Sequence, residues 1–274
     1  MTPFSATPDR PFRLRPLDPR PTPCKVCDGE SPLFGVQDFN RSCEEVRGKF
    51  LPLTGAPIYY RRCRGCGLLF TDAFDDWADA DFAAHIYNDR YVEVDPDFEE
   101  KRPVGNAGLV ARTFKDFGGG LDVLDYGGGN GRFAAELGQA GFRSARTYDR
   151  FHPAHSERPP GRFNMVTCFE TLEHMPDPKA GAAELASLLA DDGLLILSTL
   201  VQTKEFARDR MHWWYIGPRN GHITLFTYKA MARLFGELGL QVFATASPAL
   251  HMVCREVPEF AHQVLRGAQP VPAG

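Results

Sequence analysis

The sequence predicts an α/β fold, in which a Rossmann-like sheet carries helices on both faces and a small cysteine-rich module precedes it. The first observation is the stretch from Leu121 to Ala134, where an apolar run ends at Asp125 and a glycine turn leads into helical spacing. Further short apolar runs, bounded by turn residues, follow along the chain. Two C-x-x-C sequences lie near the N-terminus. Together these patterns predict one α/β domain behind a smaller module.

The composition sets limits on the class of protein. At 274 residues, the chain can hold one full α/β domain and a smaller appendage. Its formal charge of −4 gives no general attraction to nucleic acid or to anionic membranes. No stretch reaches the ~20 apolar residues of a membrane helix, and the N-terminus lacks the apolar segment of a signal peptide. We therefore expect a cytoplasmic protein with no membrane partner; the sequence does not indicate its oligomeric state.

Residues 1–23 differ in composition from the rest of the chain. They contain seven prolines and four arginines and show little apolar periodicity. This composition predicts a flexible arm.

Residues 24–70 predict a zinc ribbon. Four of the seven cysteines form two C-x-x-C pairs, each with a glycine close behind: Cys24, Cys27, Cys63 and Cys66. Two such turns can place four thiolates around one Zn²⁺, which prefers tetrahedral sulfur coordination. A closed site of this kind leaves no position for water, so we expect a structural ion. A redox-active pair, an iron–sulfur cluster and a site without metal are the alternatives.

Three arginines crowd the second cysteine pair: Arg61, Arg62 and Arg64. Basic zinc ribbons can bind nucleic acid, which keeps an RNA substrate as an alternative. An acidic stretch begins directly afterwards at Asp72, and this favours the interpretation that the arginines are ordinary surface residues.

Residues 71–104 predict a helical linker or lid. Apolar side chains recur on one helical face from Asp76 to Tyr87, and Asp76 is a possible N-cap. A second amphipathic helix is expected from Asn106 to Phe117, ended by three glycines.

The glycine turn itself is compatible with two ligands. A dinucleotide fingerprint, G-x-G-x-x-G, would need glycine where Arg132 stands. What is present, from Asp125 to Gly131, is D-x-G-x-G-x-G, which resembles motif I of the class I methyltransferases that use S-adenosylmethionine. A second short strand ends at Asp149, where a carboxylate can accept two hydrogen bonds from ribose hydroxyls. That aspartate would serve NAD and S-adenosylmethionine (SAM) equally, so it supports the fold without choosing the ligand.

The motifs behind the turn carry a resemblance to a known family. The sequence FNMVTCFETLEHMPDP, which begins at Phe163, and the sequence DDGLLILSTL, which begins at Asp191, follow D-x-G-x-G-x-G in order. This order resembles the class I SAM-dependent methyltransferases over residues 105–256. Two departures are present: Asn164 replaces the usual Asp, and the link from Asp149 to Phe163 is too short for a full helix and a third strand. The acidic residue that often meets the adenine amine therefore has no assigned counterpart.

The resemblance implies a set of SAM-binding residues. The glycines should pass close to the methionine end of SAM, Asp125 should orient the turn or bind the amino group, and Asp149 should hold the ribose. Glu170 ends the next strand and should reach the cofactor or the substrate. The complete set is Asp125, Gly127, Gly129, Gly131, Asp149 and Glu170.

The catalytic candidates are His222, His174 and Glu170. His222 follows an aromatic-rich insertion, residues 202–223, that should lie over the carboxyl edge of the sheet. Those aromatic residues either line the substrate pocket or pack against the cysteine module. The alternative for His222 is capping of, or a hydrogen bond to, the helix that begins near Thr227. Residues 257–274 predict a C-terminal helix or tail.

The resemblance implies methyl transfer from SAM to a small or medium-sized acceptor, such as a sugar or another metabolite, by O- or C-methylation. A zinc module before a class I domain is similar to deoxysugar C-methyltransferases and to certain ribosomal RNA methyltransferases. An RNA methyltransferase and a SAM-binding scaffold without catalysis are therefore the alternative functions.

Overall fold

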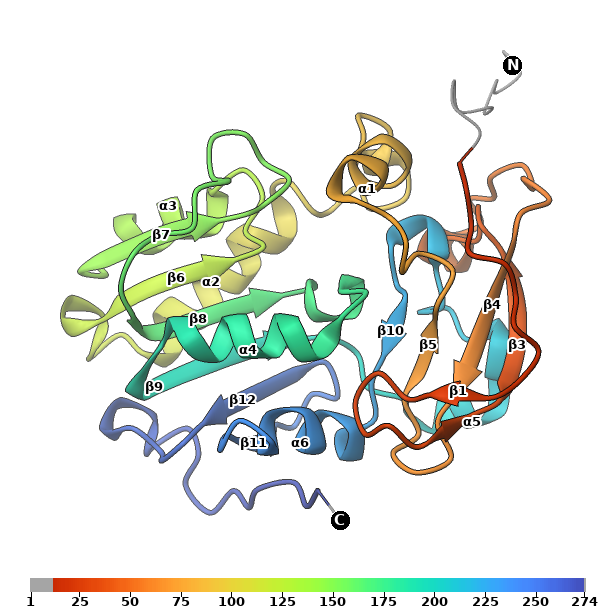
Figure 1. The fold of residues 1–274 in the computed structure, drawn as a ribbon. Coiled ribbons are helices and arrows are strands. Elements are labelled where there is room, and N and C mark those ends of the chain that lie inside the picture. The colour runs from red at the N-terminus through yellow and green to blue at the C-terminus, as the bar shows by residue number, and fades with distance from the viewer. Residues whose placement is uncertain (1–11, 274) are drawn as a thin grey trace.

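The computed structural model describes residues 12–273 of the chain. A six-stranded sheet forms the larger part of the molecule, and a second, four-stranded sheet forms the smaller part (Figure 1). In spatial order, the strands of the large sheet are β11 (Gln241–Ala244), β12 (Leu250–Cys254), β9 (Leu189–Ser198), β8 (Phe163–Phe169), β6 (Asp122–Tyr126) and β7 (Ser144–Tyr148). Strands β7, β6, β8 and β9 are parallel, whereas β12 and β11 are antiparallel. The predicted α/β class is confirmed.

Helices cover both faces of this sheet, because its strands are apolar on both sides. Val123 contacts α2 and α3, whereas its neighbour Leu124 faces α4 and α6, as the two-residue period of a strand requires. The helices are α2 (Lys101–Thr113), α3 (Arg132–Gln139), α4 (Pro178–Leu188) and α6 (Tyr228–Gly236).

Strand β7 lies at the edge of the sheet. The segment between it and β8 contains only turns and bends, so the structure confirms that this link is too short for a helix and a further strand. Asp149 therefore lies next to an edge strand of the sheet.

The four-stranded sheet is antiparallel, and it is not built from the N-terminal region alone. Its strands, in spatial order, are β10 (Thr224–Leu225), β5 (Leu69–Thr71), β4 (Pro57–Arg62) and β3 (Leu33–Asp38). Strand β10 comes from the far end of the aromatic insertion, which also carries α5 (Lys204–Asp209). A two-stranded hairpin lies beside this sheet, formed by β1 (Thr22–Pro23) and β2 (Glu30–Ser31).

The insertion packs into the core of this small sheet. Trp213 is 0% exposed and Tyr215 2% exposed, and both join a cluster with Ile58, Tyr60 and Phe74. Of the two predictions for these aromatic residues, packing against the cysteine module is therefore the one that the structure supports.

Part of the predicted flexible arm is attached to the small sheet. Residues 1–11 lie outside the described residues. From Phe12 onward the chain runs along the module, where Phe12 stacks near Phe39 with ring centroids 4.7 Å apart. Arg61 also donates hydrogen bonds to the carbonyl oxygens of Asp18 and Arg20. These contacts correct the prediction for residues 12–23.

The lid helices begin and end at different residues from those predicted. Helix α1 covers only Asp79–His85, and Ala78 rather than Asp76 is its N-cap residue. Helix α2 begins five residues before Asn106, because Pro103 lies in the first turn, where its missing N–H costs nothing.

Residues 257–273 contain one 3₁₀ turn, and Val271 N–H donates to the carbonyl of Val242. Short 3₁₀ segments occur at Cys43–Arg47, Tyr91–Glu93, Gly118–Gly120, Leu172–His174, Arg210–His212, Pro218–Asn220 and Glu259–Ala261.

None of the helices in residues 12–273 is long and apolar enough to cross a membrane.

Candidate functional site

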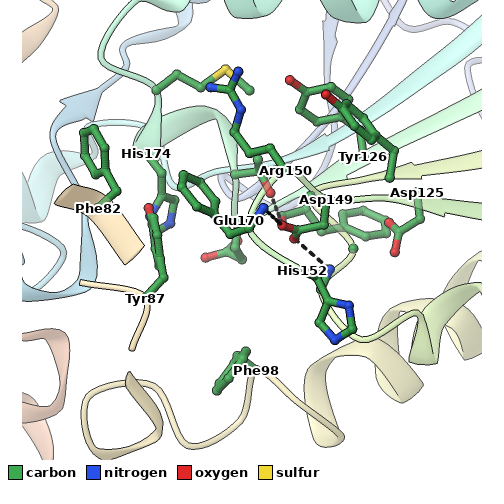
Figure 2. A pocket seen from close by; sticks show the side chains of 18 of the residues that line it. Phe82, Tyr87, Phe98, Asp125, Tyr126, Asp149, Arg150, His152, Glu170 and His174 are labelled. Atoms are coloured by element: carbon green, nitrogen blue, oxygen red, sulfur yellow. Dashed lines mark hydrogen bonds between the residues drawn. The ribbon is translucent and has the colours of Figure 1, made fainter. Parts of the chain in front are cut away.

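A cavity of about 530 Å³ lies at the carboxyl ends of β6, β7 and β8. The glycine turn after β6 forms one side, and the segment from Trp77 to Asn106 forms the opposite side (Figure 2). Parallel strands place their carboxyl ends together, and ligands of open α/β sheets bind in the crevice that results. The size is that of a small-molecule site.

The turn has a backbone that only glycine adopts without strain. Gly127, Gly129 and Gly131 all have positive φ, at +74°, +55° and +80°. A Cβ on Gly127 would lie 2.4 Å from the hydroxyl oxygen of Thr171, so the two segments touch there. Gly129 has no atom within 4 Å of its Cβ position, which leaves room for a ligand at this point. Gly131 lies behind the turn, where a Cβ would meet His155 at 2.9 Å and where the residue begins α3.

Asp125 lies beneath the turn and is only 3% exposed. Thr167 Oγ1 donates a hydrogen bond to its carboxylate at 2.8 Å. A Cβ on Gly128 would lie 2.1 Å from Asp125 Oδ2, so the carboxylate lies directly against the turn. Burial raises the pKa of Asp125 to about 7 against the effect of the Thr167 hydrogen bond. The carboxyl is thus placed to hold the turn in shape.

Asp149 follows the last residue of β7 and lines the cavity. Its Oδ2 accepts a hydrogen bond from Gly129 N–H at 2.9 Å, and Oδ1 accepts one from Phe151 N–H at 2.8 Å. The side chain therefore links the tip of the glycine turn to the link after β7, with the carboxylate facing the cavity (Figure 2).

Glu170 lies directly after β8, opposite the turn. Its φ is +47°, which is unusual for a residue with a side chain and places this carboxylate at the cavity. Ser198 donates its hydroxyl hydrogen to Glu170 Oε1 at 2.7 Å, and Glu170 N–H donates to the Ser198 carbonyl. A strained residue that faces a cavity is a functional candidate.

The two histidines predicted as bases lie at different distances from the cavity. His174 lines the cavity, and its Nδ1 lies 2.9 Å from the hydroxyl oxygen of Tyr87. Burial lowers the pKa of His174 well below its ordinary value, so the ring is neutral at pH 7. His222 packs behind it, with ring centroids 5.0 Å apart, and falls outside the described residues that line the cavity.

His222 does not cap the next helix. Its Nδ1 lies 2.8 Å from the carbonyl oxygen of Tyr215, and Thr227 supplies the cap of α6 through its own hydroxyl. The capping alternative is therefore wrong for His222. Cys43 Sγ also lies 3.5 Å from His222 Nδ1, so this histidine joins the small sheet to the wall of the cavity.

Glu173 is completely buried and accepts a hydrogen bond from the Tyr215 hydroxyl. Burial and the nearby charge of Glu170 raise the pKa of Glu173 to about 8. Glu173 is not among the described residues that line the cavity, and its contact with Tyr215 gives it a structural role.

Several cavity residues have no counterpart in the sequence prediction. Arg102 of α2 lines the cavity on the side opposite the turn and makes two hydrogen bonds to Asp95, at 2.6 and 2.9 Å. Tyr87, Tyr91 and Phe98 supply an aromatic wall. The stretch that contains these residues has no regular apolar periodicity. Its richness in aromatic and charged residues, beside a predicted helix, was the only sequence signal that it could belong to a site.

The four cysteines lie together at the base of the small sheet. Cys24 Sγ lies 3.6 Å from Cys66 Sγ, Cys27 Sγ lies 3.4 Å from Cys63 Sγ, and all four sulfur atoms lie within 4.8 Å of one another. Sulfur atoms around a tetrahedral zinc with ~2.3 Å bonds lie about 3.8 Å apart, so this donor set fits the ion.

The cysteine cluster is attached to the larger domain. Lys25, between the first two cysteines, donates a hydrogen bond to the carbonyl of Pro176 at 2.8 Å, and Pro176 lines the cavity. Thr227 donates its hydroxyl hydrogen to the carbonyl of Cys66 at 2.6 Å. The cluster therefore holds the small sheet against the domain that carries the cavity.

Comparisons with known proteins agree with this geometry. The family described as a methyltransferase domain (Methyltransf_23) matches residues 98–245, which is more than half of the chain. The ubiquinone biosynthesis O-methyltransferase of Xanthomonas campestris pv. campestris (strain B100) is 57% identical over 44 residues, which cover 16% of this chain and 18% of that protein. The corresponding protein of Aromatoleum aromaticum is 31% identical over 118 residues, 35% of this chain and 47% of its own. The chain thus spans less than half the length of these relatives.

Two solved structures show partial overlap. An O-methyltransferase family protein from Burkholderia thailandensis is 14% identical, with a TM-score of 0.46, over 62% of this chain and 60% of its own. Streptomyces venezuelae DesVI is 16% identical, with a TM-score of 0.43, over 63% of this chain and 97% of its own.

Proposed function

The chain belongs to the class I SAM-dependent methyltransferases, and we propose that it transfers a methyl group to a small or medium-sized acceptor by O- or C-methylation. One observation carries the choice of acceptor size. A single cavity of about 530 Å³ joins the glycine turn to the aromatic wall of Tyr87, Tyr91 and Phe98. A cavity of this size encloses small molecules, in which reacting groups are held close together and away from water.

The residues of the turn fit SAM. Gly129 leaves open space where the methionine end would pass, and the Asp149 carboxylate faces the same space with acceptor capacity for ribose hydroxyls. Arg102 lies across from the turn and would bind the carboxylate of the cofactor through its guanidinium group. When bound, the sulfonium of SAM supplies the methyl group. Asp125 would hold the turn in place, and Gly131 would shape the start of α3 behind it.

The acceptor would lie between the turn and the aromatic wall. Glu170 faces this space and would orient the amino group of SAM or the acceptor. For an oxygen or carbon acceptor that must lose a proton, His174 is the residue placed to take it, directly or through the Tyr87 hydroxyl at 2.9 Å. Its ring is neutral, as a proton acceptor must be. His222 would position His174 from behind.

The four-cysteine cluster would hold a structural Zn²⁺. Four sulfur ligands leave no coordination position for a substrate, so the ion would stabilise the small sheet and its attachment to the cavity.

The arginines near the cysteines give little support to RNA recognition. Arg61 is 0% exposed and its Nε lies 2.8 Å from Asp72. Arg62 lies over the rings of Phe34 and Phe206, and Arg64 pairs with Glu30. Because all three have partners within the chain, they form no free basic surface. A scaffold without catalysis would not need a base-bearing cavity beside the cofactor turn.

The test has two steps. Calorimetry with SAM should show one binding event per chain, and incubation with methyl-labelled SAM and fractionated small-molecule extract should transfer label to a product of low molecular mass. Label found only in RNA would overturn the proposed acceptor class. Binding of SAM without transfer to any fraction would favour the scaffold instead.

A further inference from the structure

The lining of the cavity is strongly acidic. Eight carboxyl groups face it, against two guanidinium groups, which gives a formal charge of −6 with the histidines neutral. The whole chain carries only −4, so negative charge is concentrated at this site. A cleft lined by one sign of charge attracts ligands of the opposite sign and repels those of the same sign.

The two guanidinium groups are not available to an anionic ligand without competition. Arg102 lies 2.6 Å from Asp95, and Arg150 lies 3.6 Å from Asp79. Both pairs are part of the lining. An anionic group at Arg102 would compete with Asp95, and the carboxylate of SAM is already assigned to that guanidinium. Arg150 has only an exposed contact with Asp79, at 3.6 Å, so it is held less firmly.

The inner carboxylates are bonded to neutral groups. Asp125 accepts from the Thr167 hydroxyl, Asp149 accepts from two backbone N–H groups, and Glu170 accepts from the Ser198 hydroxyl. Neutral donors stabilise a carboxylate without cancelling its charge. Asp149 and Glu170 therefore keep the interior negative, whereas burial raises the pKa of Asp125 to about 7 and reduces its share of the charge.

Binding of SAM reduces this charge only in part. The sulfonium and ammonium groups outweigh the carboxylate of SAM by one positive charge. Protonation of Asp125 would remove one more negative charge, so roughly −4 remains for the acceptor to meet. An anionic acceptor would meet repulsion from this field after the cofactor has bound.

The wall opposite the turn is aromatic and continuous. The ring centroids of Tyr87 and Tyr91 lie 5.4 Å apart, and those of Tyr91 and Phe98 lie 5.2 Å apart. Figure 2 shows Tyr87 and Phe98 on two sides of the open space in front of Glu170. Successive rings meet edge to face, at interplanar angles of 63° and 82°, so the wall offers both ring faces and ring edges to a planar ring or a cation.

We propose that the acceptor is a planar aromatic molecule with no charge or a positive charge, and that the site rejects anionic acceptors, including nucleotide-linked sugars. This inference rests on the proposed methyl-transfer function and narrows it. It removes phosphate-bearing substrates from the range of acceptors and keeps phenols, aromatic alcohols and aromatic amines.

The test uses aromatic molecules that share a ring and differ in charge. One such set is 3,4-dihydroxybenzylamine, 3,4-dihydroxybenzyl alcohol and 3,4-dihydroxybenzoate, and matched indole and naphthol sets extend it; thymidine diphosphate glucose is the anionic sugar probe. Each is titrated by calorimetry into the full chain saturated with S-adenosylhomocysteine. In the sets that bind, the cationic and neutral members should bind at least tenfold more tightly than the anionic member. The ratio of the Kd values of the anionic and cationic members should be smaller at high salt than at low salt, because screening weakens the field.

The double variant Asp79→Asn/Glu99→Gln provides a charge test at the rim of the cavity. Both residues line the cavity, so removal of their two negative charges should reduce the ratio of the Kd values of the anionic and cationic members severalfold. Asp76→Asn, an exposed change outside the lining, is the matched control and should leave it unaltered. Equal or tighter binding of anionic members, or of the nucleotide sugar, would overturn the charge assignment. No binding by any aromatic set would overturn the aromatic assignment. Failure of S-adenosylhomocysteine to bind at all would instead count against the proposed function itself.

Discussion

Replacement of Asp149 is the most direct perturbation of the cofactor site. The carboxylate accepts hydrogen bonds from Gly129 N–H and Phe151 N–H, and it faces the cavity. If it also holds the ribose of SAM, Asp149→Ala removes two hydrogen bonds to a charged group, each worth about 1.5–3 kcal/mol. Because about 1.4 kcal/mol corresponds to a tenfold change in Kd, a loss of about 3 kcal/mol predicts SAM binding about a hundredfold weaker.

Asp149→Asn separates the effect of losing the negative charge from the effect of losing the hydrogen-bond acceptors. Asparagine keeps the volume and one acceptor oxygen but loses the charge, so the Kd for SAM should rise by only about tenfold. The order wild type, Asn, Ala is itself part of the prediction. Asp122→Asn is the matched control, since Asp122 pairs with Arg143 at the opposite end of β6 and should leave the Kd unchanged.

Calorimetry with SAM measures these values, and thermal unfolding without ligand separates binding from folding. The loss of the two backbone contacts to the carboxylate should lower the unfolding free energy of Asp149→Ala by about 3 kcal/mol, which is below the ~5–15 kcal/mol of a typical domain. A folded Asp149→Ala variant that binds SAM within about threefold of wild type, a difference worth less than ~1 kcal/mol, would refute the assignment of Asp149 to the ribose.

Four further predictions follow from the site. Gly127→Ala should lower the free energy of unfolding in denaturant by about 2 kcal/mol or more, because its φ of +74° and its close neighbour leave no room for a methyl group; unchanged stability would contradict this. His174→Ala should lower kcat by about 10²–10⁴-fold with little change in SAM affinity, whereas His222→Ala should reduce the melting temperature and have the smaller effect on kcat; the reverse order in steady-state kinetics would exchange their roles. Burial raises the pKa of Glu173 from 4.5 to about 8. The stability that the protonated Glu173 carboxyl contributes to the wild type is therefore fully present below pH 4.5 and declines as pH rises toward 8. Glu173→Gln does not titrate, and its melting temperature relative to wild type should rise between pH 5 and pH 8; a difference that is constant with pH would exclude this. Cys63→Ser should reduce zinc from one ion per chain to near zero by elemental analysis; wild-type protein purified without chelator and free of zinc would disprove the metal site.

The features that could be predicted from the sequence are those fixed by neighbouring residues. Glycine at Gly127, Gly129 and Gly131 permits positive φ whatever surrounds the turn, so the strand–turn–helix unit was predictable. The absence of a strand between β7 and β8 was also predictable, because too few residues separate Asp149 from Phe163.

Other features depend on contacts between distant segments, and local patterns do not report them. Arg102 reaches the cavity only because α2 packs beside α3. The aromatic insertion looked equally suited to a pocket, but Trp213 lies in the core of the small sheet. Residues 12–23 have the composition of a flexible arm, yet buried Arg61 holds them through their carbonyl oxygens.

By itself, the sequence determined the class of domain and the order of its motifs, because a strand, a glycine turn and a capped helix are specified within a few residues. It also brought two histidines forward as possible bases and favoured His222 over His174. The tertiary structure instead places His174, and not His222, in the lining of the cavity. Strand β10 pairs with β5 and draws His222 toward the small sheet, behind His174, while the 3₁₀ turn after β8 directs His174 into the cavity. The reason is physical: which side chain faces a cavity depends on how distant segments pack.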